Sequence, residues 1–124
     1  KLKELSYIHA EGFASGEMKH GPIALLEDGL PIVSFVSEGK MALKAISNLK
    51  EAEARGGYII VIGTQVAVDL IDFAAAKIVI PDCEPIFAPI VGAIPVQILA
   101  YLTALEKGTD IDQPRNLAKS VTVE

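Results

Sequence analysis

The chain has 124 residues, a hydrophobic fraction of 51%, a charged fraction of 22% and a formal net charge of −5. The length suits one domain, and the apolar content excludes a disordered chain. The acidic balance, with no basic run, argues against nucleic acid or an anionic membrane as a partner.

The ends and the single cysteine bear on where the chain works. Cys83 cannot form an internal disulfide, which fits a reducing compartment such as the cytoplasm. Because Lys1–Glu4 is charged and no apolar segment of a signal peptide follows, we expect no secretory signal. The first residue is not methionine, which is typical of a fragment or a processed product.

The first part of the chain shows no strand pattern. Residues 1–8 are typical of the end of a helix whose beginning is absent, and residues 9–26 of short helical turns around glycines. We therefore expect a strand and most of a helix of the complete domain to precede Lys1.

Three short runs rich in β-branched residues predict strands at 30–36, 58–62 and 76–80. Each is almost continuously apolar, as in parallel strands covered on both faces. We expect a parallel sheet.

Helical patterns separate these runs. Residues 40–55 place Met41, Ala45, Leu49 and Ala52 on one stripe, and Gly56 is a suitable C-cap. Shorter and longer helices are expected at 66–74 and 84–107. This alternation predicts an α/β fold with right-handed crossovers.

The last helix contains the longest apolar stretch, residues 86–105. Pro89, Gly92, Pro95 and Gln97 interrupt it, which favours a buried helix of a soluble protein over a membrane span. We expect the two prolines to kink or divide the helix.

A distinct tail, residues 109–124, follows the body of the domain, residues 1–108. It carries a turn-forming run, residues 112–116, and then Lys119 between small residues. A lysine amine can attack a sugar carbonyl. The alternative is a frayed terminus, which is the common state of chain ends.

Few other residues suggest chemistry. Lys1 and Glu4 are three residues apart and can share one helix face, where the usual outcome is a solvated ion pair. His20 precedes Gly21-Pro22, which can present the imidazole at a loop edge for proton transfer. The alternative is a loop histidine bonded to a backbone carbonyl. His9, in an apolar run, is expected to be structural.

Signatures for metals and nucleotides are missing from the sequence. The two histidines and the cysteine lack the spacing of metal ligands on one helix, so we expect no metal. No G-x-G-x-x-G or Walker loop is present, and we expect no cofactor. Residues 63–65, after the second strand, come nearest to a phosphate loop, because ligands bind beyond the carboxyl ends of parallel strands.

Three segments carry a resemblance to a known family. They are SYIHAE, GEMKHGP and the ending DQPRNLAKSVTVE. With their surroundings they resemble the C-terminal part of the glutamine–fructose-6-phosphate amidotransferases, also called glucosamine-6-phosphate synthases. The resemblance covers residues 1–124 and implies a partial second sugar isomerase (SIS) domain. Such a domain is a three-layer α/β fold with a parallel sheet, here with three clear strands and the first strand missing.

The resemblance also implies roles for single residues. Lys119 is similar to the lysine that forms a Schiff base with the open-chain ketose, and Ala118 to a sugar-binding position beside it. Glu4 is similar to the carboxylate that moves a proton between the first two carbons, and Lys1 to a lysine that assists. His20 is similar to a ring-opening histidine supplied by the neighbouring subunit of a homodimer.

The implied activity is the conversion of fructose 6-phosphate to glucosamine 6-phosphate with ammonia derived from glutamine. The family's glutaminase domain and first SIS domain, which holds the sugar phosphate, are not in this sequence. Losing that binding energy costs substrate positioning, so we expect this chain alone to be inactive.

Two other functions fit parts of the pattern. One is a non-catalytic SIS module that binds a sugar phosphate for regulation or assembly, which would have no need of an amine on a tail. The other is a general nucleotide-binding α/β domain, against which the missing glycine-rich loop argues.

Overall fold

The structure, a computed structural model, describes residues 1–116 and contains two compact units. The sheet unit spans Gly12–Gly92, and the tail unit combines Lys1–Glu11 with the chain from Ala93 onward. Lys119 and Ala118 lie outside the described residues. The boundary predicted after residue 108 remains a prediction.

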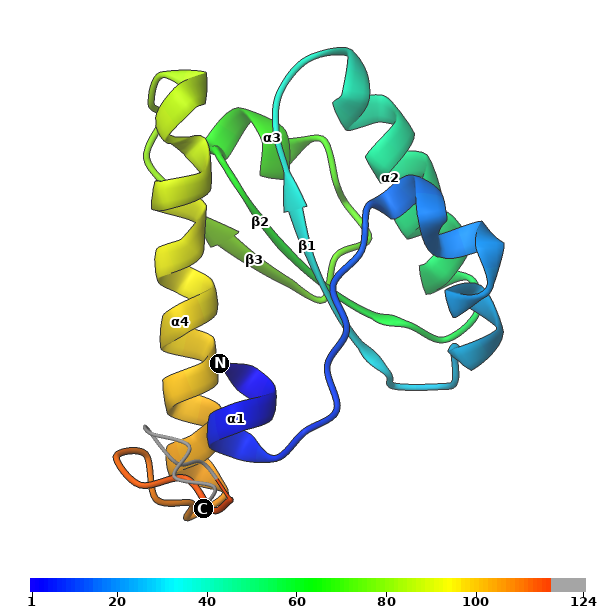
Figure 1. Cartoon of the computed structure of the whole chain (residues 1–124). Coiled ribbons are helices and arrows are strands. Elements are labelled where there is room, and N and C mark those ends of the chain that lie inside the picture. Colours follow the sequence, from blue (N-terminus) through cyan, green and yellow to red (C-terminus); the bar gives the residue numbers. More distant parts are fainter. Residues whose placement is uncertain (117–124) are drawn as a thin grey trace, which may run out of the picture. The chain divides into compact units, whose positions relative to one another are not determined.

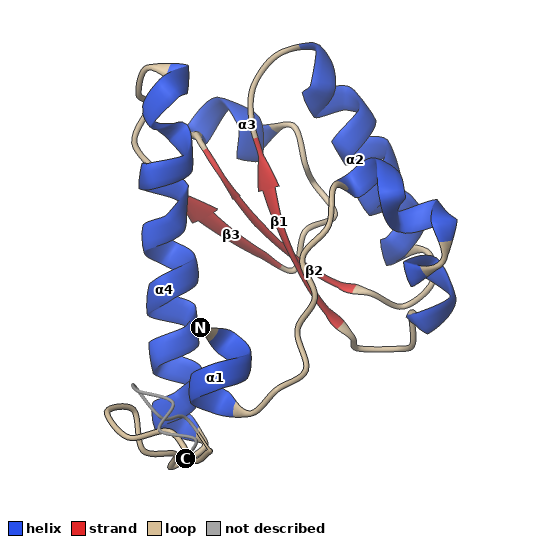
Figure 2. Cartoon of the chain, in the orientation of Figure 1, coloured by secondary structure: helices blue, strands red, loops and turns tan. Residues whose placement is uncertain are grey.

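The sheet unit contains a three-stranded parallel sheet in the order β1-β2-β3 (Figures 1 and 2). The strands are β1 (Pro31–Val36), β2 (Tyr58–Gly63) and β3 (Ala76–Val79). Their bounds differ by at most one residue from those predicted. Residues Ile59, Val61 and Ile62 of the central strand are at most 1% exposed. The predicted parallel α/β arrangement is confirmed.

Helix α2 (Lys40–Glu53) follows β1 and buries Ala42, Ile46, Leu49 and Ala52. The predicted stripe is wrong at Met41, which is 65% exposed. The predicted and the observed buried residues both have helical spacing. The sequence pattern therefore did not decide the rotation of α2 about its axis to within one position, or about 100°. The observed rotation buries the branched Ile46 in the core.

Two glycines shape the turns of this unit. Gly56 follows α2 with a φ of 88°, and its N–H donates to the Glu53 carbonyl at 2.9 Å. The left-handed backbone there confirms the expected glycine stop. Gly63 ends β2, and a Cβ at this position would lie 2.7 Å from the Val36 carbonyl oxygen. Only glycine lets these two backbones approach so closely.

Helix α3 (Gln65–Asp69) is shorter than the predicted 66–74. The chain leaves the helix at Leu70, and Ile71 is then fully buried. The apolar residues after the helix pack into the core from an irregular segment. Periodicity alone does not distinguish such a segment from a helix.

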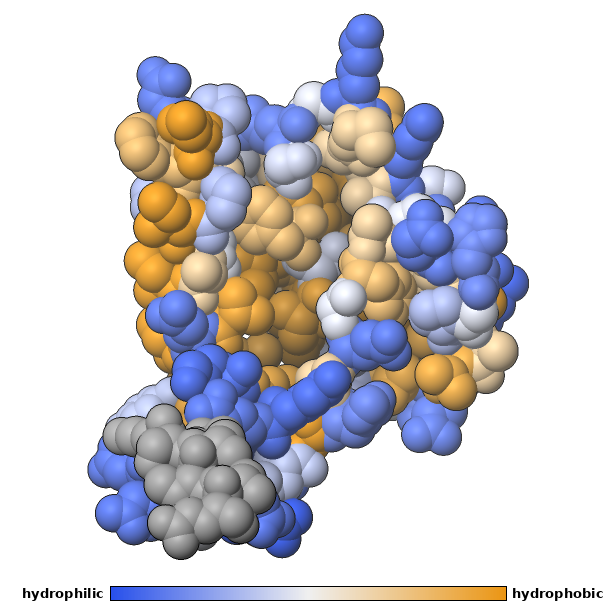
Figure 3. Space-filling model, viewed as in Figure 1, coloured by the Kyte–Doolittle hydropathy of each residue, from blue (hydrophilic) through white to orange (hydrophobic). Residues whose placement is uncertain are grey.

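The 3₁₀ turn η3 (Pro85–Phe87) leads into α4 (Ala88–Glu106). The predicted division at a proline is wrong, since α4 is one helix that contains Pro95. The stretch Pro85–Glu106 is long and apolar enough to cross a membrane, and 11% of its most apolar window is buried. Figure 3 shows orange, hydrophobic side chains along α4.

The expected burial of this helix is therefore wrong for the described chain. Ile90, Ile98 and Leu102 are 66%, 52% and 55% exposed, whereas Ala100 and Ala104 are buried. A helix that is apolar on all sides indicates burial without indicating which protein surface covers it.

Candidate active site

The short helix α1 (Leu2–Ser6) carries a paired carboxylate. Lys1 Nζ lies 3.0 Å from each oxygen of Glu4, and the Glu4 side chain is 28% exposed. On this helix Ser6 is fully buried, and its hydroxyl donates to the Leu2 carbonyl at 2.7 Å. The i, i+3 spacing of Lys1 and Glu4 thus brings the two predicted residues together, as the sequence indicated.

The tail begins where α4 ends in a Schellman motif. Gly108, at a φ of 65°, donates its N–H to the Leu105 carbonyl, and the Thr109 N–H donates to the Ala104 carbonyl at 3.0 Å. This pair of bonds satisfies carbonyls that the helix end leaves free. The Thr109 hydroxyl donates to the Leu5 carbonyl at 2.6 Å, which ties the start of the tail to α1.

A local turn then reverses the chain. Asp110 Oδ1 accepts from the backbone N–H groups of Asp112 and Gln113, at 2.9 and 2.8 Å. An aspartate that bonds the backbone a few residues on is the usual way for this residue to stabilise a turn. Pro114 is buried directly after it.

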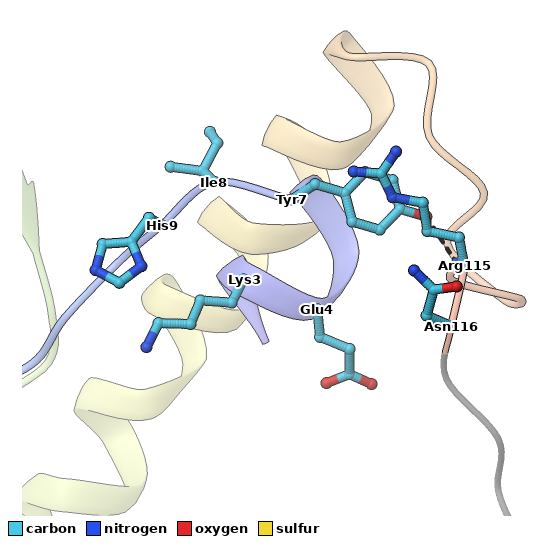
Figure 4. Close-up of a pocket in the computed structure, with 7 residues that line it drawn as sticks. All are labelled: Lys3, Glu4, Tyr7, Ile8, His9, Arg115 and Asn116. Atoms are coloured by element: carbon cyan, nitrogen blue, oxygen red, sulfur yellow. Dashed lines mark hydrogen bonds between the residues drawn. The ribbon is translucent and has the colours of Figure 1, made fainter.

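Beyond Pro114 the tail returns to α1 at Tyr7. The Arg115 N–H donates to Tyr7 Oη at 2.9 Å, and the Arg115 guanidinium lies over the Tyr7 ring, 4.1 Å from its centroid. Figure 4 shows this stacking and the backbone bond together. Two independent contacts therefore hold Arg115 to one side chain.

An open pocket of about 420 Å³ lies in the tail unit, between α1 and the returning tail (Figure 4). Its lining combines cationic and polar groups with one carboxylate, from Lys3, Glu4, Tyr7, Ile8, His9, Arg115 and Asn116. The charge and openness suit a small polar molecule in contact with Glu4.

His20, the remaining predicted residue, belongs to the sheet unit. It is the last residue of the 3₁₀ helix η1 (Ser15–His20), which precedes a second 3₁₀ helix, η2 (Pro22–Leu25). Met18 is buried in the core, whereas His20 is exposed beside Gly21 at a φ of 144°. The sequence thus presents the imidazole at a loop edge, as predicted.

Among the seven residues that line the pocket, only Glu4 was a candidate from the sequence. Tyr7 and Arg115 lie in segments that carry the family resemblance, but no chemical motif singled them out as site residues. The expectation that His9 is structural is wrong, since His9 is exposed and lines the pocket. Its place directly after a helix end was the available signal.

The structure argues against residues 63–65 as a phosphate loop. The Thr64 hydroxyl accepts from the Ala67 N–H at 3.3 Å as the cap of α3, and donates to Glu38 Oε1 at 2.5 Å. A carboxylate therefore occupies the surroundings that an anionic ligand would need. Among residues 1–116, no group of three or more metal-ligating side chains occurs.

Comparison with known proteins identifies the family. The SIS domain model matches residues 1–107. The chain belongs to the SIS domain family. Within that family it is 53% identical, over its full length, to "Glutamine--fructose-6-phosphate aminotransferase [isomerizing]" of Sphingobium yanoikuyae, and covers 80% of that protein. The membership confirms the resemblance found in the sequence.

Longer relatives carry the same name. The protein of Zymomonas mobilis is 56% identical over the whole of this SIS chain, which spans 21% of its length. The protein of Thermus thermophilus is 52% identical, and the chain spans 20% of it. The chain thus corresponds to about a fifth of these relatives.

A solved structure agrees with the fold. It is the C-terminal domain of glucosamine-fructose-6-phosphate aminotransferase from Francisella tularensis, with a TM-score of 0.81 and 42% identity. The match covers 90% of this chain and 32% of that one. The SIS fold predicted from the sequence is confirmed.

Proposed function

We propose that this chain is the second SIS domain and catalytic tail of a glutamine–fructose-6-phosphate aminotransferase (isomerizing). In the complete enzyme it performs the isomerase chemistry that turns fructose 6-phosphate and glutamine-derived ammonia into glucosamine 6-phosphate. The observation that carries the proposal is identity of 53 to 56% over the full chain with proteins of that name. The Lys1–Glu4 ion pair adds support, because its carboxylate lines the pocket.

In the proposed reaction, the Lys119 amine attacks the ketose carbonyl, and water leaves as the imine forms. The imine withdraws electrons and acidifies the adjacent C–H. Ammonia then displaces the Lys119 amine from the imine, which frees the lysine and leaves the new nitrogen on the sugar. Glu4 takes a proton from the first carbon and returns it to the second. The Lys1 ammonium, 3.0 Å from the Glu4 oxygens, can assist proton transfer to oxygen. Ala118 contacts the sugar beside Lys119.

His20 is proposed to open the sugar ring in the active site of a neighbouring subunit. Its exposure on the sheet unit leaves the imidazole available to another chain. The proposed enzyme is a homodimer, needs no metal or cofactor, and acts in the cytoplasm. Its other domains supply ammonia and hold the sugar phosphate.

A chimeric enzyme tests the proposal directly. This chain replaces the matching segment of the Zymomonas mobilis relative, to which it is 56% identical. We expect glucosamine 6-phosphate from the chimera and, with borohydride and fructose 6-phosphate, a reduced adduct on Lys119. The Lys119→Arg variant keeps the charge but cannot form the imine, and should lose both.

The outcomes separate the proposal from its alternative. Ammonia release from glutamine shows that the portion supplied by the relative is folded. Sugar-phosphate binding without turnover in such a chimera favours a non-catalytic SIS module. Full turnover by Lys119→Arg refutes the assigned nucleophile.

Mixing subunits tests whether His20 acts across a dimer. His20→Asn and Lys119→Arg enzymes should each be inactive. After random reassortment, half of the dimers are mixed and each holds one intact site, so activity should return to about a quarter of the unmodified level. If His20 serves its own subunit, the mixture stays inactive.

A further inference from the structure

We propose that Tyr7 and Arg115 form a clasp that positions the tail for imine formation. The clasp consists of the Arg115 N–H bond to Tyr7 Oη and the stacking of the Arg115 guanidinium on the Tyr7 ring. The inference rests on the proposed function, because it assigns positioning residues to the amine of Lys119. Neither Tyr7 nor Arg115 needs to contact the sugar in this role.

The backbone of Tyr7 gives the first reason. Its φ is 58° and its ψ 22°, the left-handed conformation that glycine or asparagine usually supplies at a helix end. A bulky residue at positive φ is an outlier that costs stability. Glycine would end α1 without strain, so the side chain of Tyr7 is the feature that offsets this cost. Its described contacts are those with Arg115.

The geometry of the contacts gives the second reason. The hydrogen bond uses the backbone of Arg115, so it fixes the path of the chain. The stacking uses the side chain, so it fixes the same residue from a second direction. Asn116 follows at a φ of 60°, a conformation that asparagine tolerates, and the chain turns directly after the clasp.

The clasp is the last contact that the structure describes before the nucleophile. The Thr109 hydroxyl holds the start of the tail to Leu5, and Asp110 organises the turn between. Three residues separate Arg115 from Lys119, and the four chain steps between their Cα atoms span at most about 14 Å. Fixing Arg115 on α1 therefore limits how far the amine of Lys119 can move from the helix that carries Glu4.

Confinement of this kind raises the effective concentration of the amine near the sugar. The clasp is partly exposed, so the loss of one of its contacts should lower the rate of imine formation modestly and not abolish it. One neutral hydrogen bond corresponds to about a fivefold change in an equilibrium. Exposed stacking of a cation on an aromatic ring corresponds to about threefold.

The first measurement reads the clasp without reference to catalysis. Trypsin cleaves after Arg115 once the tail detaches, and mass spectrometry identifies that product from the full-length chimera. Tyr7→Phe, which keeps the ring but removes the hydroxyl, should raise the cleavage rate about fivefold. The matched control is Tyr58→Phe, which removes an exposed tyrosine hydroxyl at the start of β2.

The second measurement reads the nucleophile. The rate of borohydride trapping at saturating fructose 6-phosphate should fall about fivefold in Tyr7→Phe and about threefold in Arg115→Ala. Tyr7→Ala should lower it by about the product, roughly 15-fold, and adding Arg115→Ala to Tyr7→Ala should change little more. The Michaelis constant for the sugar should stay unchanged, which a general loss of structure would not allow. Arg55→Ala is the control for the arginine.

The results distinguish the clasp from the function on which it rests. If the unmodified chimera forms no adduct on Lys119, the proposed function fails and the positioning role falls with it. If the adduct forms at the same rate in all variants, the function stands and the clasp has no positioning role, whatever trypsin reports. Equal trypsin cleavage in Tyr7→Phe and the unmodified chimera also overturns the clasp.

Discussion

Different forces stabilise the sheet unit and the tail unit. In the sheet unit, β2 and α2 contribute most of a cluster of buried aliphatic side chains, which includes Ile59, Val61 and Leu49. In the tail unit, segments distant in sequence meet through polar contacts, Thr109 with Leu5 and Arg115 with Tyr7. Burial stabilises the scaffold, whereas a few directional bonds place the groups proposed to act on the sugar. The comparison predicts that changes in the core of the sheet unit lower stability, whereas changes around Glu4 in the tail unit lower activity.

The largest effect is expected in the tail unit at Glu4. Glu4→Gln keeps the shape of the side chain but removes the base, so turnover should fall by about 10² to 10⁴. Imine trapping on Lys119 should persist, while deuterium exchange from solvent into the sugar should stop. Glu11→Gln, an exposed change in the same unit, is the control. Unchanged deuterium exchange in Glu4→Gln would remove Glu4 from the proposed mechanism.

The next largest effect is expected from a substitution that creates a cavity in the core of the sheet unit. Ile59 is 1% exposed within the core, so Ile59→Ala should lower the free energy of unfolding by about 2 to 5 kcal/mol. Denaturant unfolding of the full-length chimera measures the loss, and Val66→Ala, at a residue 61% exposed, should cost little. Imine formation below the unfolding transition should keep its rate. A selective loss of imine formation would show that the two units are not separable.

A smaller loss of stability is expected from added volume at Gly63. The new Cβ of Gly63→Ala would lie 2.7 Å from the Val36 carbonyl oxygen, which forces the backbones of β1 and β2 apart. We expect a loss of about 1 to 3 kcal/mol. Gly12→Ala is the matched control, because nothing lies within 4 Å of its added Cβ. Equal melting temperatures for the two variants would contradict the close approach.

The smallest effect is expected at Thr109. Thr109→Val removes the hydroxyl that bonds to the Leu5 carbonyl, at a cost of about 1 kcal/mol. Amide hydrogen exchange at Leu5 and Tyr7 should accelerate about fivefold as α1 loosens. Thr109→Ser keeps a hydroxyl and should restore slow exchange. Equal exchange in Thr109→Val and the unmodified chimera would show that this bond does not hold α1.

The sheet unit was the more predictable of the two from sequence. Continuous apolar runs between glycines located the strands to within a residue, because burial on both faces leaves a strong compositional signal. The same signal misjudged details that depend on three-dimensional packing. The rotation of α2 placed Met41 outside, and the apolar segment around Ile71 proved not to be helical.

The tail unit was predictable only where contacts are local. Lys1 and Glu4 pair across one turn of helix, so their spacing was enough. The bond from Thr109 to Leu5 joins residues 104 apart, and that from Arg115 to Tyr7 residues 108 apart. Hydroxyl and ring contacts over such separations depend on the fold, and no periodic pattern in the sequence predicts them.

The bond between Thr64 and Glu38 has a consequence for the anions that this edge of the sheet can accept. Both residues lie just beyond the carboxyl ends of neighbouring parallel strands, where α/β proteins commonly bind phosphates. Here the Glu38 carboxylate is held at that edge, where it repels a phosphate group but tolerates neutral hydroxyls. This edge of the sheet unit therefore disfavours phosphate binding, although its position beyond parallel strands is where phosphates commonly bind.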